Sequence, residues 1–165
     1  VMLGGSLLVA PVFTKSGDVD YYLPEGTWTN FLTGEVVEGG KWRHEVHDFM
    51  SLPLMARENS LIAVGADDQK VEYDYGKDLT LHLFSLKDQA VAHVKDMYGN
   101  HLLKACAENV DGKVTLTFEG RAENLKVLLR NIHTVQNLTG AEAQDTTQGL
   151  LLTVNARLDP VAFTL

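Results

Sequence analysis

Two histidines and an aspartate lie close together in the first half of the chain and could suggest a metal site. They are His44, His47 and Asp48. On a β-strand, His44 and His47 would point to opposite faces because their separation is odd. A ligand pair would therefore need a turn between them and a third donor. We interpret His47 as a hydrogen-bonded structural residue, and we expect neither a metal nor another cofactor. The other histidines are scattered singly, and we interpret each as structural or exposed: His82, His93, His101 and His133.

Aromatic residues gather over a short stretch that could bind sugar, because aromatic faces stack on pyranose rings. They are Tyr21, Tyr22, Trp28, Phe31 and Trp42. The alternative is that they fill the core of a small β-sandwich or its contact with a neighbouring domain. We favour the alternative. Trp28, Phe31 and Trp42 are our candidates for a docking surface or, failing that, a sugar platform.

Other single residues give weaker signals. Arg57 and Arg130 each follow an apolar run and could hold a carboxylate at a strand end. Asn137 begins a match to the glycosylation acceptor pattern, which without a secretory signal has no weight. Cys106 is alone, so no disulfide framework exists, and its small neighbours indicate a filler at a strand position.

The aromatic stretch has the pattern of β-hairpins. Turn signals recur at Pro24-Glu25-Gly26, Thr33-Gly34 and Gly39-Gly40. Between them, residues 27–31 and 41–46 are rich in aromatic and β-branched types, which favour strands. We expect further strands within residues 7–13, 19–23, 51–57 and 60–64.

The second half of the chain changes to longer alternating strands. Leu79, Leu81 and Leu83 recur with a period of two, as do Val114, Leu116 and Phe118. Residues 125–132, 150–154 and 161–165 indicate further strands. Residues 141–148 could make a helical turn, but their polarity favours a loop. No segment has convincing helical periodicity. The sequence therefore predicts an all-β fold with two small antiparallel β-sandwich domains in tandem, over residues 1–76 and 77–165.

Composition excludes several classes of function. The 165 residues are 45% hydrophobic, enough for a real core, and carry a formal charge of -8. That charge argues against nucleic-acid binding, which needs clustered Lys and Arg. No apolar run approaches the roughly 18 residues that cross a bilayer. We expect a cytoplasmic protein without membrane partners, and we interpret the strand-like start at Val1 as part of something longer.

Several segments together resemble a known family. They are MLGGSLLVAPVF, YLPEGTWTNFLTGE, GGKW, SLP and ARENSLIAVG, then YDYGKDLTLHLFSL, LKVLLRNI, QGLLLTV and FTL. In this order they resemble the region after the catalytic barrel in glycoside hydrolase family 31, most closely its bacterial α-xylosidases and α-glucosidases. The resemblance covers nearly the whole chain. Gly5 departs from it, since an Asp is common at this position in the family.

The resemblance implies what the parent enzyme does and where its chemistry lies. It implies retaining hydrolysis of α-linked xylose or glucose by two aspartates on the barrel, upstream of this region, without a cofactor. No Asp or Glu here matches either catalytic motif, so we expect this chain alone to be inactive. We expect its acidic residues near the start to be solvated charges in turns and at hairpin ends: Asp18, Asp20, Glu25, Glu35 and Glu38.

The resemblance also implies partners. Two β-sandwich domains, one proximal and one distal, would support the catalytic barrel, and self-association is a further possibility. An α-linked oligosaccharide would be the substrate of the parent. The alternative function is a carbohydrate-binding module that uses exposed aromatic residues.

Overall fold

The computed structural model describes residues 2–3, 6–9, 18–46, 54–65 and 77–165. These residues form strands and turns without a helix, which confirms the all-β prediction. It follows that they contain no helix of the length and apolarity needed to span a membrane. Contacts divide the chain into two compact units, Val1–Glu58 and Asn59–Leu165. The division predicted between residues 76 and 77 stays a prediction, because residues 66–76 lie outside the described part.

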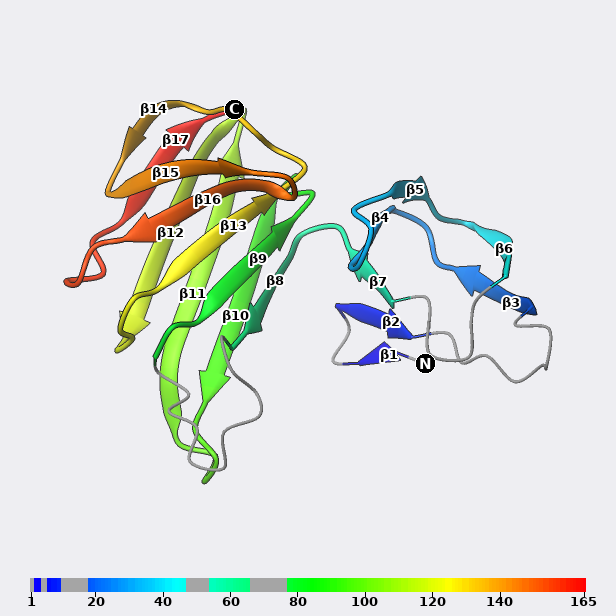
Figure 1. Ribbon diagram of the computed structural model, residues 1–165, viewed down its shortest axis with the longest axis horizontal. Helices are drawn as coiled ribbons and strands as arrows, with labels where there is room; N and C mark the ends of the chain where they lie inside the picture. Colours follow the sequence, from blue (N-terminus) through cyan, green and yellow to red (C-terminus); the bar gives the residue numbers. More distant parts are fainter. Residues whose placement is uncertain (1, 4–5, 10–17, 47–53, 66–76) are drawn as a thin grey trace. The chain divides into compact units, whose positions relative to one another are not determined.

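The first unit contains a five-stranded sheet and a two-stranded ribbon (Figure 1). The sheet has the strand order β1 (Met2–Leu3), β2 (Leu7–Val9), β7 (Leu54–Arg57), β4 (Thr27–Asn30) and β5 (Val36–Glu38). The ribbon pairs β3 (Asp18–Leu23) with β6 (Lys41–Val46) in antiparallel fashion.

A small core holds the first unit together. Its buried members are Leu8, Tyr21, Leu23, Trp28 and Met55. Period-two alternation along β3 turns Tyr21 and Leu23 to the same face, and both are buried. Full burial of a large apolar side chain contributes about 1.5–3 kcal/mol, so each of these few residues matters to this unit.

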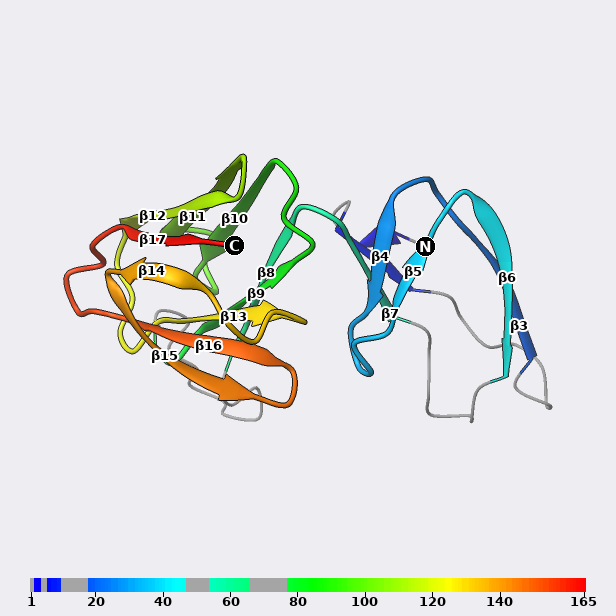
Figure 2. The same cartoon turned by 90° about the horizontal axis from the view of Figure 1, so that it is seen from above.

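The second unit is a sandwich of two five-stranded sheets, whose layers are visible in Figure 2. One sheet has the order β10 (Gln89–Lys95), β11 (His101–Val110), β12 (Lys113–Gly120), β17 (Val161–Thr164) and β14 (Gln136–Thr139). The other has the order β15 (Ala141–Thr146), β16 (Gly149–Val154), β13 (Lys126–Arg130), β9 (Thr80–Phe84) and β8 (Ser60–Val64).

The core of the second unit follows the alternation expected from the sequence. Leu81 and Leu83 of β9 are buried, as are Val114 and Leu116 of β12, and all four belong to one apolar cluster. The intervening Thr115 is exposed. The period-two pattern therefore selects the residues that fill the space between the sheets.

Two features of the second unit differ from the sequence-based expectations. β13 pairs with β9 in parallel, with Leu128 opposite His82, so the sandwich is not wholly antiparallel. The prediction of a loop over residues 141–148 was wrong, because Ala141–Thr146 form β15 and pair with β16. β15 is an edge strand with mostly exposed side chains, so backbone hydrogen bonds rather than apolar alternation define it.

Gly140 and Gly99 provide a test of how tightly the second unit is packed. Their φ values are +84° and +83°, but a Cβ at Gly140 would lie 2.1 Å from the Pro160 carbonyl oxygen, whereas one at Gly99 would meet nothing within 4 Å. Both Gly→Ala changes cost about 1–2 kcal/mol from left-handed strain. We expect Gly140→Ala to cost about 1–3 kcal/mol more, because the backbones must move apart.

Urea unfolding of the two variants measures this difference directly. Equal midpoints for Gly140→Ala and Gly99→Ala would contradict the close approach of the β14–β15 turn to Pro160.

Candidate functional site

The β3–β6 ribbon brings together polar and aromatic residues in pairs. Asp20 lies directly opposite His44, and Tyr22 directly opposite Trp42. These four side chains are exposed, while Tyr21, between Asp20 and Tyr22, is buried. Because Asp18 precedes Asp20 by two residues, it shares their side of the strand. We call Asp18, Asp20, Tyr22, Trp42 and His44 the outer face of the ribbon.

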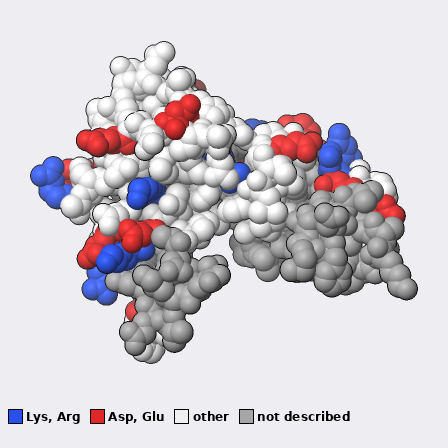
Figure 3. Space-filling view, viewed as in Figure 1, with Lys and Arg blue, Asp and Glu red and all other residues white. Residues whose placement is uncertain are grey.

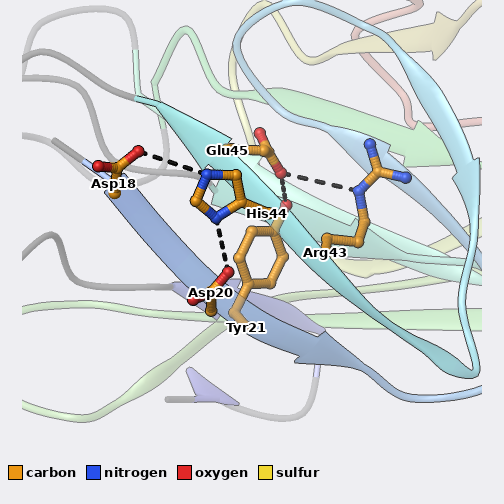
Figure 4. Close-up of polar contacts among 6 residues, drawn as sticks. All are labelled: Asp18, Asp20, Tyr21, Arg43, His44 and Glu45. Atoms are coloured by element: carbon orange, nitrogen blue, oxygen red, sulfur yellow. Dashed lines mark hydrogen bonds and ion pairs between the residues drawn. The ribbon is translucent and has the colours of Figure 1, made fainter.

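His44 is held between two carboxylates on the outer face (Figure 4). Its Nδ1 lies 2.6 Å from Asp20 Oδ1, and its Nε2 lies 3.3 Å from Asp18 Oδ1. A neutral imidazole has one N–H donor, whereas the imidazolium has two and can serve both carboxylates. The pKa of His44 is therefore raised above its ordinary 6.5, first by the hydrogen bond to Asp20.

A second network lies on the other side of the ribbon. The Tyr21 hydroxyl donates a hydrogen bond to Glu45 Oε2, and Arg43 Nε lies 3.7 Å from the same oxygen (Figure 4). Burial of the phenol, together with the Glu45 carboxylate, raises the pKa of Tyr21 above its ordinary value. Tyr21 therefore stays protonated at neutral pH, and its hydroxyl joins β3 to β6 as a hydrogen-bond donor.

The three aromatic candidates have different environments. Trp28 is fully buried in the first unit's core, its indole N–H donates to the Pro24 carbonyl oxygen at 2.8 Å, and the Arg57 guanidinium lies 5.0 Å from its ring centre. Trp28 therefore belongs to the core and is not available for a flat, solvent-facing platform with Trp42. Trp42 is 71% exposed, and Phe31 is half-buried.

Trp42 has an exposed aromatic neighbour, Tyr22, which belongs to the aromatic stretch of the sequence but was not among the three candidates. The ring centres of Tyr22 and Trp42 are 5.8 Å apart and their planes are inclined by 58°. Direct pairing across an antiparallel ribbon produces such contacts. The two rings form a V-shaped aromatic surface instead of a coplanar one.

The acidic residues near the start only partly match the expectation. Glu25 and Glu35 lie outside the strands, and Glu38 is the last residue of β5, opposite Thr27 at the open end of the β4–β5 hairpin. Asp20 instead lies within β3 and binds His44, which corrects the interpretation of a solvated loop charge. The sequence could have shown this, because alternation along a strand places Asp18 and Asp20 on the same face as Tyr22.

The histidines expected to be structural or exposed occupy several environments. Among the described residues, no group of three or more His, Cys, Asp or Glu could hold a metal ion. His47 and Asp48 lie outside the described part of the chain. His133 Nδ1 lies 2.7 Å from Asp145 Oδ1. The exposed His93 and His101 rings contact each other, with their centres 6.2 Å apart.

The half-buried His82 and the buried Arg130 lie next to each other on neighbouring strands of the second unit. Arg130 is 3% exposed, and its guanidinium lies 5.0 Å from the centre of the Phe84 ring. Its Nη1 lies 3.2 Å from His82 Nδ1. Burial, aided by the Arg130 charge, lowers the pKa of His82 to about 4, so this histidine stays neutral at physiological pH.

The sequence left open whether Arg57 and Arg130 each hold a carboxylate, and in the structure an aromatic ring lies beside each guanidinium group. Arg57 lies over Trp28, and Arg130 lies over Phe84. A guanidinium is attracted to the negative face of an aromatic ring, most strongly where water is excluded. Sequence alone could not supply these partners, because Trp28 and Phe84 lie on other strands far along the chain from the arginines.

Among the described residues of the second unit, two surface depressions of about 360 and 290 Å³ share Thr153 and Val154 in their walls. Each contains one carboxylate, Glu142 in the first and Glu123 in the second. A single carboxylate cannot provide the nucleophile and acid pair of a retaining glycosidase.

Comparisons with known proteins match the chain along most of its length. The family model "Glycosyl hydrolase family 31 C-terminal domain" matches residues 1–62, and the model "Alpha-xylosidase YicI, C-terminal domain" matches residues 74–165. Alpha-xylosidase XylQ of Lactiplantibacillus pentosus is 35% identical over 123 residues, which are 72% of this chain and 16% of that protein. Alpha-glucosidase 2 of Bacillus thermoamyloliquefaciens is 30% identical over 94 residues, covering 56% of this chain and 12% of that protein.

A solved structure has the same fold. The cycloalternan-forming enzyme from Listeria monocytogenes, in complex with a pentasaccharide substrate, aligns with a TM-score of 0.75 at 22% identity. The alignment covers 99% of this chain and 18% of that enzyme. The chain therefore spans less than a fifth of the length of each of these three proteins.

We call the contacts of His44 with Asp18 and Asp20 the His44 clamp, and this clamp predicts how the stability of the ribbon depends on pH. Because the folded-state pKa of His44 lies above 6.5, the clamp contributes fully to stability below that pH and is lost as the pH rises through the folded-state pKa. We expect an NMR titration of the His44 ring to give a pKa above 6.5. Asp20→Asn should lower that pKa more than Asp18→Asn, since Asp20 is the larger cause.

The two Asn variants are matched, because each removes one negative charge from the same strand and keeps the side-chain shape. A wild-type His44 pKa at or below 6.5, or a larger effect from Asp18→Asn than from Asp20→Asn, would contradict the clamp.

Proposed function

This chain belongs to the C-terminal region of glycosyl hydrolase family 31, and from that membership we propose that it supports the catalytic barrel of a retaining α-glycosidase. The observation that carries the proposal is the succession of two family models, in order, over residues 1–62 and 74–165. C-terminal domains of this family accompany a catalytic domain. The relatives named as α-xylosidase and α-glucosidase favour an enzyme that hydrolyses α-xylosides or α-glucosides.

The described polar groups favour a supporting role over a catalytic one. Asp18 and Asp20 hold one imidazole, and Glu45 accepts from the Tyr21 hydroxyl. These contacts fasten one strand to the next and provide no free nucleophile facing an acid. The carboxylates that cleave the glycosidic bond would thus belong to the barrel.

The hairpin between β4 and β5 offers the apolar surface for docking. Leu32 is 63% exposed and Val36 is 48% exposed, and the half-buried Phe31 lies beside Leu32 in the chain. Asn30 fixes this turn, because its Oδ1 accepts hydrogen bonds from the backbone N–H groups of Leu32 and Thr33. We call Phe31, Leu32 and Val36 the docking patch, and the catalytic barrel of the same enzyme is its proposed partner.

The docking patch can contribute usefully to association. Burial of a few hundred Å² of apolar surface contributes several kcal/mol at about 25 cal/mol per Å² before ordering costs are subtracted. The fixed turn reduces those costs, since Leu32 is presented on a backbone that is already ordered. In the isolated chain the same patch would be exposed, and we propose that it promotes self-association.

The first test separates support from catalysis. The purified 165-residue chain should not hydrolyse p-nitrophenyl α-xyloside or p-nitrophenyl α-glucoside, whereas the full-length enzyme should release p-nitrophenol from at least one of them. Turnover by the 165-residue chain that persists through independent purifications would overturn the supporting role.

The second test addresses the docking patch within the full-length enzyme. We expect Leu32→Asp to shorten the half-life of thermal inactivation several-fold, because a charge would be buried against the barrel. Val110→Asp is the matched control, since Val110 is a similarly exposed aliphatic residue, at 56%, in the second unit. Equal half-lives for the two variants would argue against docking through this patch.

A further inference from the structure

The outer face of the ribbon combines an aromatic surface with hydrogen-bonding groups, and the contacts that fasten β3 to β6 through His44 do not use the exposed rings of Tyr22 and Trp42. We propose that it is a non-catalytic binding site for an α-linked oligosaccharide, in which a pyranose ring stacks on Trp42. The inference rests on the proposed function only for the linkage of the sugar. The aromatic and polar contacts themselves come from the ribbon.

The aromatic half of this site is formed by Tyr22 and Trp42. They are 45% and 71% exposed, and their rings meet at 58° with centres 5.8 Å apart. The apolar C–H face of a pyranose can pack on the indole while the inclined phenol closes one side. An isolated exposed aromatic residue would lack that second wall.

The polar half of the site lies two residues away on each strand, before Tyr22 on β3 and after Trp42 on β6, about 7 Å from the aromatic pair. Asp20 and His44 are opposite each other there, with the Asp20 side chain 72% exposed. His44 fixes the orientation of this carboxylate through the 2.6 Å contact to Oδ1. A sugar ring stacked on Trp42, or the next ring of the same oligosaccharide, can place a hydroxyl donor at this carboxylate.

The combination of exposed aromatic rings with carboxylates and an imidazole favours a sugar over a protein surface or a nucleic acid. An apolar protein surface would strip water from Asp18, Asp20 and His44 without replacing their hydrogen bonds, which is costly. A phosphate group or nucleic acid would meet two carboxylates on a chain of formal charge -8. The visible face in Figure 3 also shows Lys and Arg interspersed with Asp and Glu, without a continuous basic surface among the described residues. A neutral sugar has an apolar face and many hydroxyls, so it satisfies both halves of the site.

Titration of the 165-residue chain with isomaltotriose and maltotriose tests the site. The chain has two tryptophans, and Trp28 is fully buried, so a saturable change in tryptophan fluorescence would report on Trp42. In titration calorimetry we expect Trp42→Ala to abolish binding, and Tyr22→Ala and Asp20→Asn to weaken it by about tenfold each. Tyr98→Ala is the control and should bind normally, because Tyr98 is an 82% exposed aromatic residue in the second unit.

Circular dichroism shows whether each variant is folded, and Trp42→Phe, which keeps an aromatic face, should retain part of the affinity. Absence of saturable binding at millimolar sugar would overturn the proposal. So would binding that Trp42→Ala leaves unchanged, or self-association that depends on Trp42 without sugar binding. No hydrolysis is measured, so failure here is distinct from failure of the proposed function.

Discussion

The register of the β3–β6 ribbon is the constraint on which the polar chemistry of this chain depends. Pairing of Tyr22 with Trp42 and of Asp20 with His44 turns Tyr21 and Leu23 towards the core of the first unit. A slip by one residue would exchange the two faces of the slipped strand and bury charged groups in place of apolar ones. The burial of Tyr21 and Leu23 therefore fixes the register, and the register determines on which face each polar group of the ribbon lies.

An isolated two-stranded ribbon is marginally stable in water, so additional cross-strand contacts matter here. On the outer face, His44 binds carboxylates of the facing strand, and on the inner face the Tyr21 hydroxyl binds Glu45. Both sets of contacts join β3 to β6 and fit only this register. The same contacts hold the exposed aromatic pair in place, which is what an ordered binding surface requires.

The sequence predicted those parts of the fold in which side-chain burial decides the structure. Leu81 and Leu83 were recognised by alternation and fill the sandwich core. β15 was missed because its polar side chains are mostly exposed and its stability comes from backbone pairing with β16. The parallel pairing of β9 with β13 depends on the three-dimensional path of the chain, and periodicity along one strand contains no information about its partner.

For the candidate site, the sequence identified the aromatic residues but not their environments. Trp28 and Trp42 lie in similar hairpin segments, yet one is in the core and the other is exposed. The arginine partners were missed for a related reason, since Arg57 meets Trp28 from a neighbouring strand that is remote in sequence.

The register of the ribbon can be measured most directly by cross-strand nuclear Overhauser effects between backbone protons. We expect contacts between Tyr22 and Trp42 and between Asp20 and His44, because the residues of each pair are directly opposite each other. Contacts that instead pair Tyr21 with Trp42 would show a one-residue slip, and the His44 clamp and the proposed sugar site would both be contradicted.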